Sequence, residues 1–159
     1  MKHLKRFNEA LERDVDGDFT AATLDEIKEY CEINLAYLLD LGMFIECSDI
    51  IDDNTGSHEC QVELLFDDIP ASTILDQVIP FFKRIKNDYQ LGTWIAHPKA
   101  NFFFNSGEGQ YFISYEELDN IENYLVDKPS NQRNIESGFG VKIHNINFYI
   151  VDDETFNEK

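Results

Sequence analysis

The segment 59–66 alternates polar and apolar residues over most of its length, and this pattern constrains the fold more than any other feature of the chain. Successive side chains of a strand point to opposite sides, so such a segment buries one face and exposes the other. The inward residues are Cys60, Val62, Leu64 and Phe66. Segment 43–51 also has the composition of a strand, and a turn at 52–56 separates the two segments. The pattern therefore predicts an antiparallel hairpin.

Two longer segments have the periodicity of amphipathic helices. The first begins at Thr23, an expected N-cap with Glu26 as its capping-box partner, and ends at Gly42. Its inward stripe is Leu24, Ile27, Cys31, Leu35 and Leu38. The second covers residues 71–89, with Ile74, Val78, Phe81, Phe82, Ile85 and Tyr89 inward. Pro80 lies within it, and because proline removes a backbone hydrogen bond we expect a kink or a break there.

The remaining segments add short strands and one more helix. Strand composition recurs in 93–96, 101–104, 110–113 and 141–151. Ser114 is expected to cap a third helix with Glu117 as its capping-box partner, and 128–140 has the composition of a polar loop. This element order predicts an α+β fold, in which an antiparallel sheet of about five strands has helices packed on one face. A short N-terminal helical arm is expected to precede it.

Charge divides the chain into two unequal parts. The sequence has 13 basic and 31 acidic residues, a formal net charge of −18. Residues 1–13 have four basic and two acidic residues, so this leader is +2 and the rest of the chain holds −20. We expect a basic leader at 1–13, an acidic α+β domain at 14–151 and an acidic tail at 152–159. Such a charge repels nucleic acid and anionic membranes and attracts a protein partner with a basic surface. The apolar runs are too short for a transmembrane helix.

Cysteine and histidine positions do not assemble a catalytic site. The three cysteines are an odd number without CxxC spacing, which favours reduced thiols in a cytosolic protein. Cys31 and Cys60 fall on apolar stripes and are predicted core residues. A hydrolase would need His97 or His144 in a deep pocket beside a carboxylate, but His97 is expected to pack among aromatic residues. His144 alternates with Ile146 and is expected to be buried. The sequence predicts neither an enzyme nor a cofactor.

An aromatic run at 102–104 stands near Trp94 and Phe112. Aromatic platforms that bind nucleic acid also need basic neighbours, and here the nearby basic residue is Lys99. The run therefore predicts core packing or a protein-binding patch.

Residues 14–25 resemble the first half of the calcium-binding loop of EF-hand proteins. That loop supplies oxygen ligands from its first, third, fifth and seventh positions, has glycine at the sixth and a bidentate glutamate at the twelfth. The candidate metal ligands are Asp14, Asp16, Asp18, Thr20 and Asp25. Phe19 occupies the glycine position and Asp25 the glutamate position, so any site is expected to be weak, with a Kd on the order of 10⁻⁴–10⁻³ M. The alternative is an acidic linker whose carboxylates favour the start of the following helix.

The first twelve residues resemble the leader of small orphan proteins and internal head proteins of large tailed bacteriophages. The resemblance rests on Met1-Lys2, further basic residues and Phe7-Asn8-Glu9. In the internal head proteins a similar leader directs the protein into the prohead, and a maturation protease cuts after an apolar-any-Glu triplet. The resemblance implies Glu9 and Glu12 as processing sites, although the second triplet begins with alanine rather than the commoner leucine or isoleucine.

These features predict a non-enzymatic phage accessory protein that binds another protein in the host cytoplasm, and the leader adds packaging in the virion as a further hypothesis. Two alternatives stay open. One is a DNA mimic that inhibits a host nuclease or DNA-binding protein, which requires carboxylates gathered on one elongated face rather than spread evenly. The other is a weak calcium-binding module.

Overall fold

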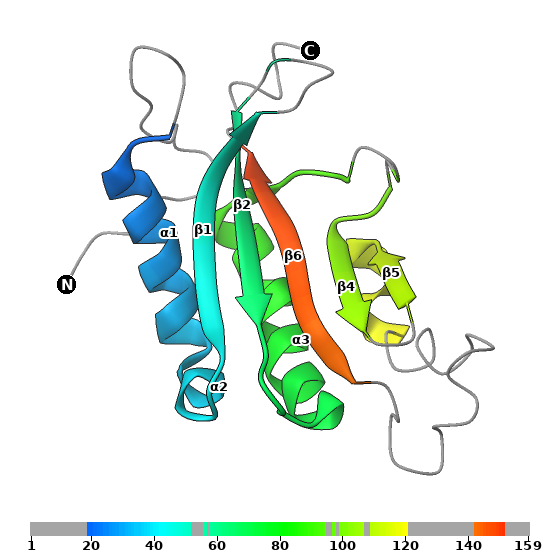
Figure 1. The fold of residues 1–159 in the computed structure, drawn as a ribbon. Coiled ribbons are helices and arrows are strands. Elements are labelled where there is room, and N and C mark those ends of the chain that lie inside the picture. Colours follow the sequence, from blue (N-terminus) through cyan, green and yellow to red (C-terminus); the bar gives the residue numbers. More distant parts are fainter. Residues whose placement is uncertain are drawn as a thin grey trace.

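The computed structural model describes residues 19–51, 56, 58–94, 97, 99–106, 109–120 and 142–151, and these form an α+β domain (Figure 1). In chain order the elements are α1 (Ala21–Asn34), α2 (Ala36–Asp40), β1 (Phe44–Ile51), β2 (His58–Leu65), α3 (Ala71–Asp88), β3 (Gln90–Leu91), β4 (Phe102–Ser106), β5 (Gly109–Ile113), the 3-10 helix η1 (Tyr115–Asn120) and β6 (Ile143–Val151). The predicted fold class is confirmed. The predicted N-terminal arm and the acidic tail lie outside the described residues.

The sheet is antiparallel throughout, in the order β1-β2-β6-β4-β5, and the two-residue β3 pairs with β6. The predicted hairpin is confirmed as β1 and β2, in which Cys47 lies opposite Val62 and Asp49 opposite Cys60. The last strand, β6, enters the middle of the sheet between β2 and β4. It therefore joins the N-terminal hairpin to the β4–β5 hairpin.

The hydrophobic core lies between the sheet and helices that cover one of its faces (Figure 1). α3 contributes Phe81 and Phe82, both nearly inaccessible to solvent. The Phe82 ring stacks on Phe102 of β4, with ring centroids 4.0 Å apart, and meets Phe148 of β6 edge to face at 5.7 Å. Such aromatic pairs add about 0.5–1.5 kcal/mol each beyond the burial of their area. Aromatic contacts thus join α3 to β4 and β6, within a core that also contains many aliphatic side chains.

The first helix begins earlier than its sequence predicts. The N-cap is Thr20, whose hydroxyl oxygen accepts a hydrogen bond from the Thr23 backbone amide at 3.1 Å. The prediction of Thr23 as the cap was wrong, because Ala21 and Ala22 are good helix formers and add residues before it. Thr23 itself is buried inside the helix.

The sequence predicted a kink or a break at Pro80, and the break is wrong because α3 continues through Pro80 as a single helix. Pro80 is exposed. The carbonyl that loses its partner, four residues earlier at Asp76, lies on the same solvent-facing side and can bond to water. The opposite face, which includes Val78 and Phe82, is fully buried and holds the helix against the sheet. Packing therefore outweighs the cost of one missing backbone bond.

Two other predicted elements differ. The predicted strand 93–96 is not a strand in its described residues: Trp94 forms an isolated antiparallel bridge with His97, and the Ala100 amide donates back to the His97 carbonyl at 2.8 Å. The third predicted helix is the 3-10 helix η1, with Leu118 buried. Its expected continuation past residue 120, including Ile121 and Leu125, lies outside the described residues.

A β-bulge reverses the expected orientation of His144. Along β4 and β6, Asn105 pairs with Asn145 but Ser106 pairs with Ile143, so the register shifts by one residue. An extra residue in one strand turns the following side chains to the opposite face. Ile143 is consequently buried and His144 is exposed, which corrects the prediction of a buried histidine.

Candidate functional site

The sheet face opposite the helices carries a second aromatic cluster, made of Trp94, His97, Phe103, Phe112 and Tyr149. The Trp94 ring lies 5.4 Å from both Phe103 and Tyr149, measured between ring centroids. His97 stacks on Phe112 at 3.8 Å. The aromatic run at 102–104 thus divides, because Phe102 and Phe104 enter the main core while Phe103 points to the other face. Core packing of this run is confirmed for Phe102 and Phe104.

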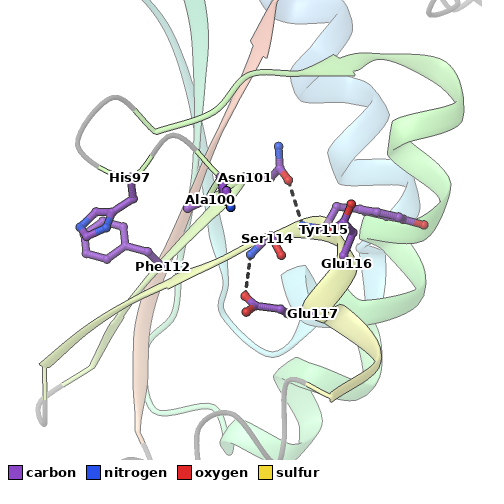
Figure 2. Close-up of a pocket in the computed structure, with 9 residues that line it drawn as sticks. His97, Ala100, Asn101, Phe112, Ser114, Tyr115, Glu116 and Glu117 are labelled. Atoms are coloured by element: carbon purple, nitrogen blue, oxygen red, sulfur yellow. Dashed lines mark hydrogen bonds between the residues drawn. The ribbon is translucent and has the colours of Figure 1, made fainter.

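An open hollow of about 900 Å³ lies beside this cluster, at the β5–η1 end of the domain (Figure 2). Its lining residues are His97, Lys99, Ala100, Asn101, Phe112, Ser114, Tyr115, Glu116 and Glu117. The Asn101 amide group donates to the Gly92 carbonyl at 3.3 Å, and its oxygen accepts from the Tyr115 amide at 2.9 Å. Asn101 therefore ties the 92–100 loop to the start of η1.

The carboxylates of the hollow do not approach its histidine. Glu117 accepts a hydrogen bond from the Ser114 backbone amide at 3.0 Å, which confirms half of the predicted capping box. Figure 2 shows His97 and Phe112 at one end of the hollow, with Glu116 and Glu117 at the other. His97 is exposed apart from its stacking contact. Among the drawn residues, the structure brings together no pair of histidine and carboxylate of the kind that general-base chemistry uses.

A second hollow, of about 390 Å³, runs along β1, the strand at one edge of the sheet. We call it the β1-edge groove. Its lining residues are Leu24, Asp25 and Lys28 of α1, Ile45, Glu46, Cys47 and Ser48 of β1, and Gln61 and Glu63 of β2. α1 lies next to β1 at this edge (Figure 1). The groove therefore has an apolar element in Leu24 and Ile45, and carboxylates along its rim.

Asp49, the residue after Ser48 in β1, connects the start of α1 to the β1–β2 hairpin. Its Oδ1 atom accepts a hydrogen bond from the Phe19 backbone amide at 3.0 Å, and its Oδ2 atom lies 2.7 Å from Nδ1 of His58. Both Asp49 and His58 are largely buried. The residue before the α1 cap is therefore held against the β1–β2 hairpin.

All three cysteines are free thiols, and the thiols of Cys47 and Cys60 are joined by a hydrogen bond. Burial raises the pKa of the Cys31 thiol. A hydrogen bond to Cys47, and then burial, raises the pKa of the Cys60 thiol. The prediction that Cys31 and Cys60 are core residues is confirmed. Cys47 is only half-buried and lines the groove.

The acidic residues are concentrated in one part of the fold. Among the described residues, those in 19–82 include 12 acidic residues and one basic residue, Lys28, whereas those in 83–120 include four acidic and four basic residues. The described part of the acidic stretch forms α1, α2, β1, β2 and the start of α3, and the balanced part forms the end of α3, β4, β5 and η1. We call the first group the acidic half. Its charge imbalance was visible in the sequence, but its gathering at one edge of the sheet required the topology.

The proposed calcium ligands are only partly within the described residues. Asp14, Asp16 and Asp18 lie outside them, as do the processing sites Glu9 and Glu12. The Thr20 carbonyl, proposed as a ligand, accepts the Leu24 amide at 3.0 Å as the first bond of α1. Asp25 is exposed on α1 and faces the groove. Within the described ranges no group of three or more potential ligands is placed to hold a metal ion, and the calcium hypothesis stays a prediction.

The comparisons with known proteins identify no relative. No protein-family model matches the chain, and searches of curated proteins and of solved structures found no similar protein. Among the helices that the structure describes, none has the length and apolarity needed to cross a membrane.

Proposed function

We propose that this protein is a non-enzymatic binding protein that recognises a basic surface of another protein through its acidic half. The observation that carries this proposal is the uneven distribution of charge over the fold. Carboxylates that face one partner act together in attracting it, and they raise the rate of association at low ionic strength. The near-neutral half around β4, β5 and η1 contributes little to such attraction.

Exposed apolar side chains in the acidic half favour a protein as the partner. The large hydrophobic residues with the greatest exposure among those described are Ile33, Tyr37, Leu41, Phe44 and Ile51. All five belong to the segment from α1 to β1. Aromatic and aliphatic anchors supply most of the affinity of protein interfaces, whereas charge supplies orientation and speed.

A charge-removal experiment tests this assignment with a lysine-rich peptide as the probe. Glu46→Gln with Glu63→Gln is compared with a matched control, Glu116→Gln with Glu117→Gln, in the neutral half. Because exposed pairs are worth about 0.2–1 kcal/mol each, the first double variant should weaken binding by about 2- to 30-fold and the control should not. Fluorescence anisotropy at low and high salt measures the affinity of each double variant for the peptide. Equal losses in the two double variants, or binding that salt does not weaken, would contradict the proposal.

The biological setting that we propose is that of an accessory protein of a tailed bacteriophage, present in the host cytoplasm and in a packaged form in the virion. The leader resemblance at residues 1–12 supports it. Mass spectrometry of purified virions tests the packaged form, which should lack the residues before a cut at Glu9 or Glu12. Absence from virions would refute packaging, and presence there with an intact leader would refute processing.

A second candidate is a DNA mimic, which the gathering of carboxylates on one half also favours. The two functions differ in their need for apolar contacts. Tyr37→Ser should weaken binding to a protein partner that uses the exposed side chains, but it should leave a mimic unchanged. Competition with duplex DNA for a nuclease or DNA-binding protein of the host would identify the mimic.

A further inference from the structure

The inference below rests on the proposed function and concerns how the basic partner is bound. We propose that the β1-edge groove takes an extended segment of the partner, with alternating basic and apolar residues, as an additional strand beside β1. The sheet would then continue from β1 into the partner.

The position of β1 supplies the backbone part of this recognition. β1 pairs with β2 on one side and stands at the end of the strand order among the described strands. In an antiparallel pair, alternate residues direct their N–H and C=O groups away from the partner strand, so an edge strand offers them to another chain. The groove runs along residues 45–48 of this edge. Peptides that add to a sheet edge gain affinity from such main-chain bonds and specificity from alternate side chains.

The side chains around the groove define the sequence of the segment. Ile45 and Cys47 share the face on which the helices pack, and Leu24 of α1 lies beside them. Glu46 points to the opposite face, where Glu63 lies directly across the β1–β2 pair. A strand alongside would place every second side chain near Ile45 and Leu24, and the others near the two glutamates. Apolar residues suit the first set and basic residues the second.

Charge argues against a second copy of this chain as the occupant. Each copy carries a net charge of −18. Antiparallel pairing of two β1 strands would bring the Glu46 side chains of both copies to the same face of a joined sheet, together with both copies of Glu63. Like charges placed across neighbouring strands destabilise the pairing. A basic segment relieves the repulsion that a second copy would increase.

Cys47 provides a direct probe of the groove. It is half-buried and lines the groove, whereas Cys31 and Cys60 are fully buried and serve as internal controls in the same molecule. The full chain is treated with iodoacetamide, and the rate at each cysteine is measured by peptide mass spectrometry. Two blocked peptides of equal composition are compared: Lys-Val-Lys-Val-Lys-Val-Lys, which alternates, and Lys-Lys-Lys-Lys-Val-Val-Val, which does not.

The alternating peptide at saturation should slow labelling of Cys47 at least about tenfold, and it should protect from hydrogen exchange those amides of residues 45–48 that point away from β2. The peptide Lys-Lys-Lys-Lys-Val-Val-Val should neither slow the labelling of Cys47 nor protect these amides. If the alternating peptide binds and Cys47 labelling and amide exchange do not change, strand addition is wrong while recognition of basic chains stands. If neither peptide binds at low salt, the proposed function fails as well. If Cys47 labels as slowly as Cys31 in the chain without peptide, the inference is overturned, because the groove is then already filled. Sedimentation would show whether the protein itself or a second copy fills it.

Discussion

Replacing Phe82 by alanine tests how much the aromatic packing between α3 and the sheet contributes to stability. Phe82 has no solvent exposure, and its ring contacts Phe102, Phe104 and Phe148 at centroid distances of 4.0, 6.4 and 5.7 Å. Truncation of a buried phenylalanine costs about 3–5 kcal/mol, because transfer free energy is lost and a cavity remains. The surrounding rings belong to two different strands, β4 and β6, and cannot all close in, so we expect a loss of about 4 kcal/mol.

A loss of this size is a large part of the total free energy of unfolding, which is about 5–15 kcal/mol for a typical domain. In a domain of this length each kcal/mol lowers Tm by about 2–4 °C, so Tm should fall by about 8–16 °C. Urea unfolding is measured by circular dichroism and by the fluorescence of Trp94, the one tryptophan in the sequence. Trp94 contacts Tyr149 on the far face of the sheet, and Phe148 beside it in β6 contacts Phe82. Both probes should therefore show the same shift in midpoint.

Phe44→Ala is the matched control, because Phe44 is 65% exposed on β1. It should change the free energy of unfolding by less than about 0.5 kcal/mol. A loss below about 1 kcal/mol for Phe82→Ala would refute the reasoning, since the ring would then not be close-packed. A shift seen by circular dichroism but not by Trp94 fluorescence would also refute it, because the two faces of the sheet would unfold separately.

Three further predictions concern individual side chains. Burial raises the pKa of Tyr149 from 10.0 to about 12, so the neutral phenol stabilises the fold below pH 10 and this contribution is lost as pH rises toward 12. Tyr149→Phe should therefore reduce the loss of stability between pH 9 and 12, as measured by urea unfolding. Asn101→Ala removes both bonds that join the 92–100 loop to η1 and should lower the free energy of unfolding by about 1–3 kcal/mol, with faster hydrogen exchange in η1 as the local sign. Thr20→Ala should cost about 1 kcal/mol through loss of the α1 cap, whereas Thr20→Ser should cost much less, and chemical denaturation distinguishes them.

The sequence alone determined the local elements whose residues carry their own signal. Alternation predicted the β1–β2 hairpin, and apolar periodicity predicted α3, because both patterns are dictated by the geometry of one strand or one helix. The cap of α1 was misplaced by three residues, since Thr20 and Thr23 are equally good caps in sequence and only the backbone conformation selects one. The break at Pro80 was wrongly predicted, because local propensity does not include the packing of the opposite helix face.

Tertiary structure decided where these elements meet. β6 enters between β2 and β4, a long-range pairing that no local pattern encodes, and a bulge within it turns His144 outward. The same topology places β1 at the sheet edge beside α1 and so creates the β1-edge groove with Cys47 in its wall. The sequence contains the excess of acidic residues, but the distribution of these charges over the surface is set only when the chain folds. The acidic half exists as a surface because α1, β1 and β2 are neighbours in space.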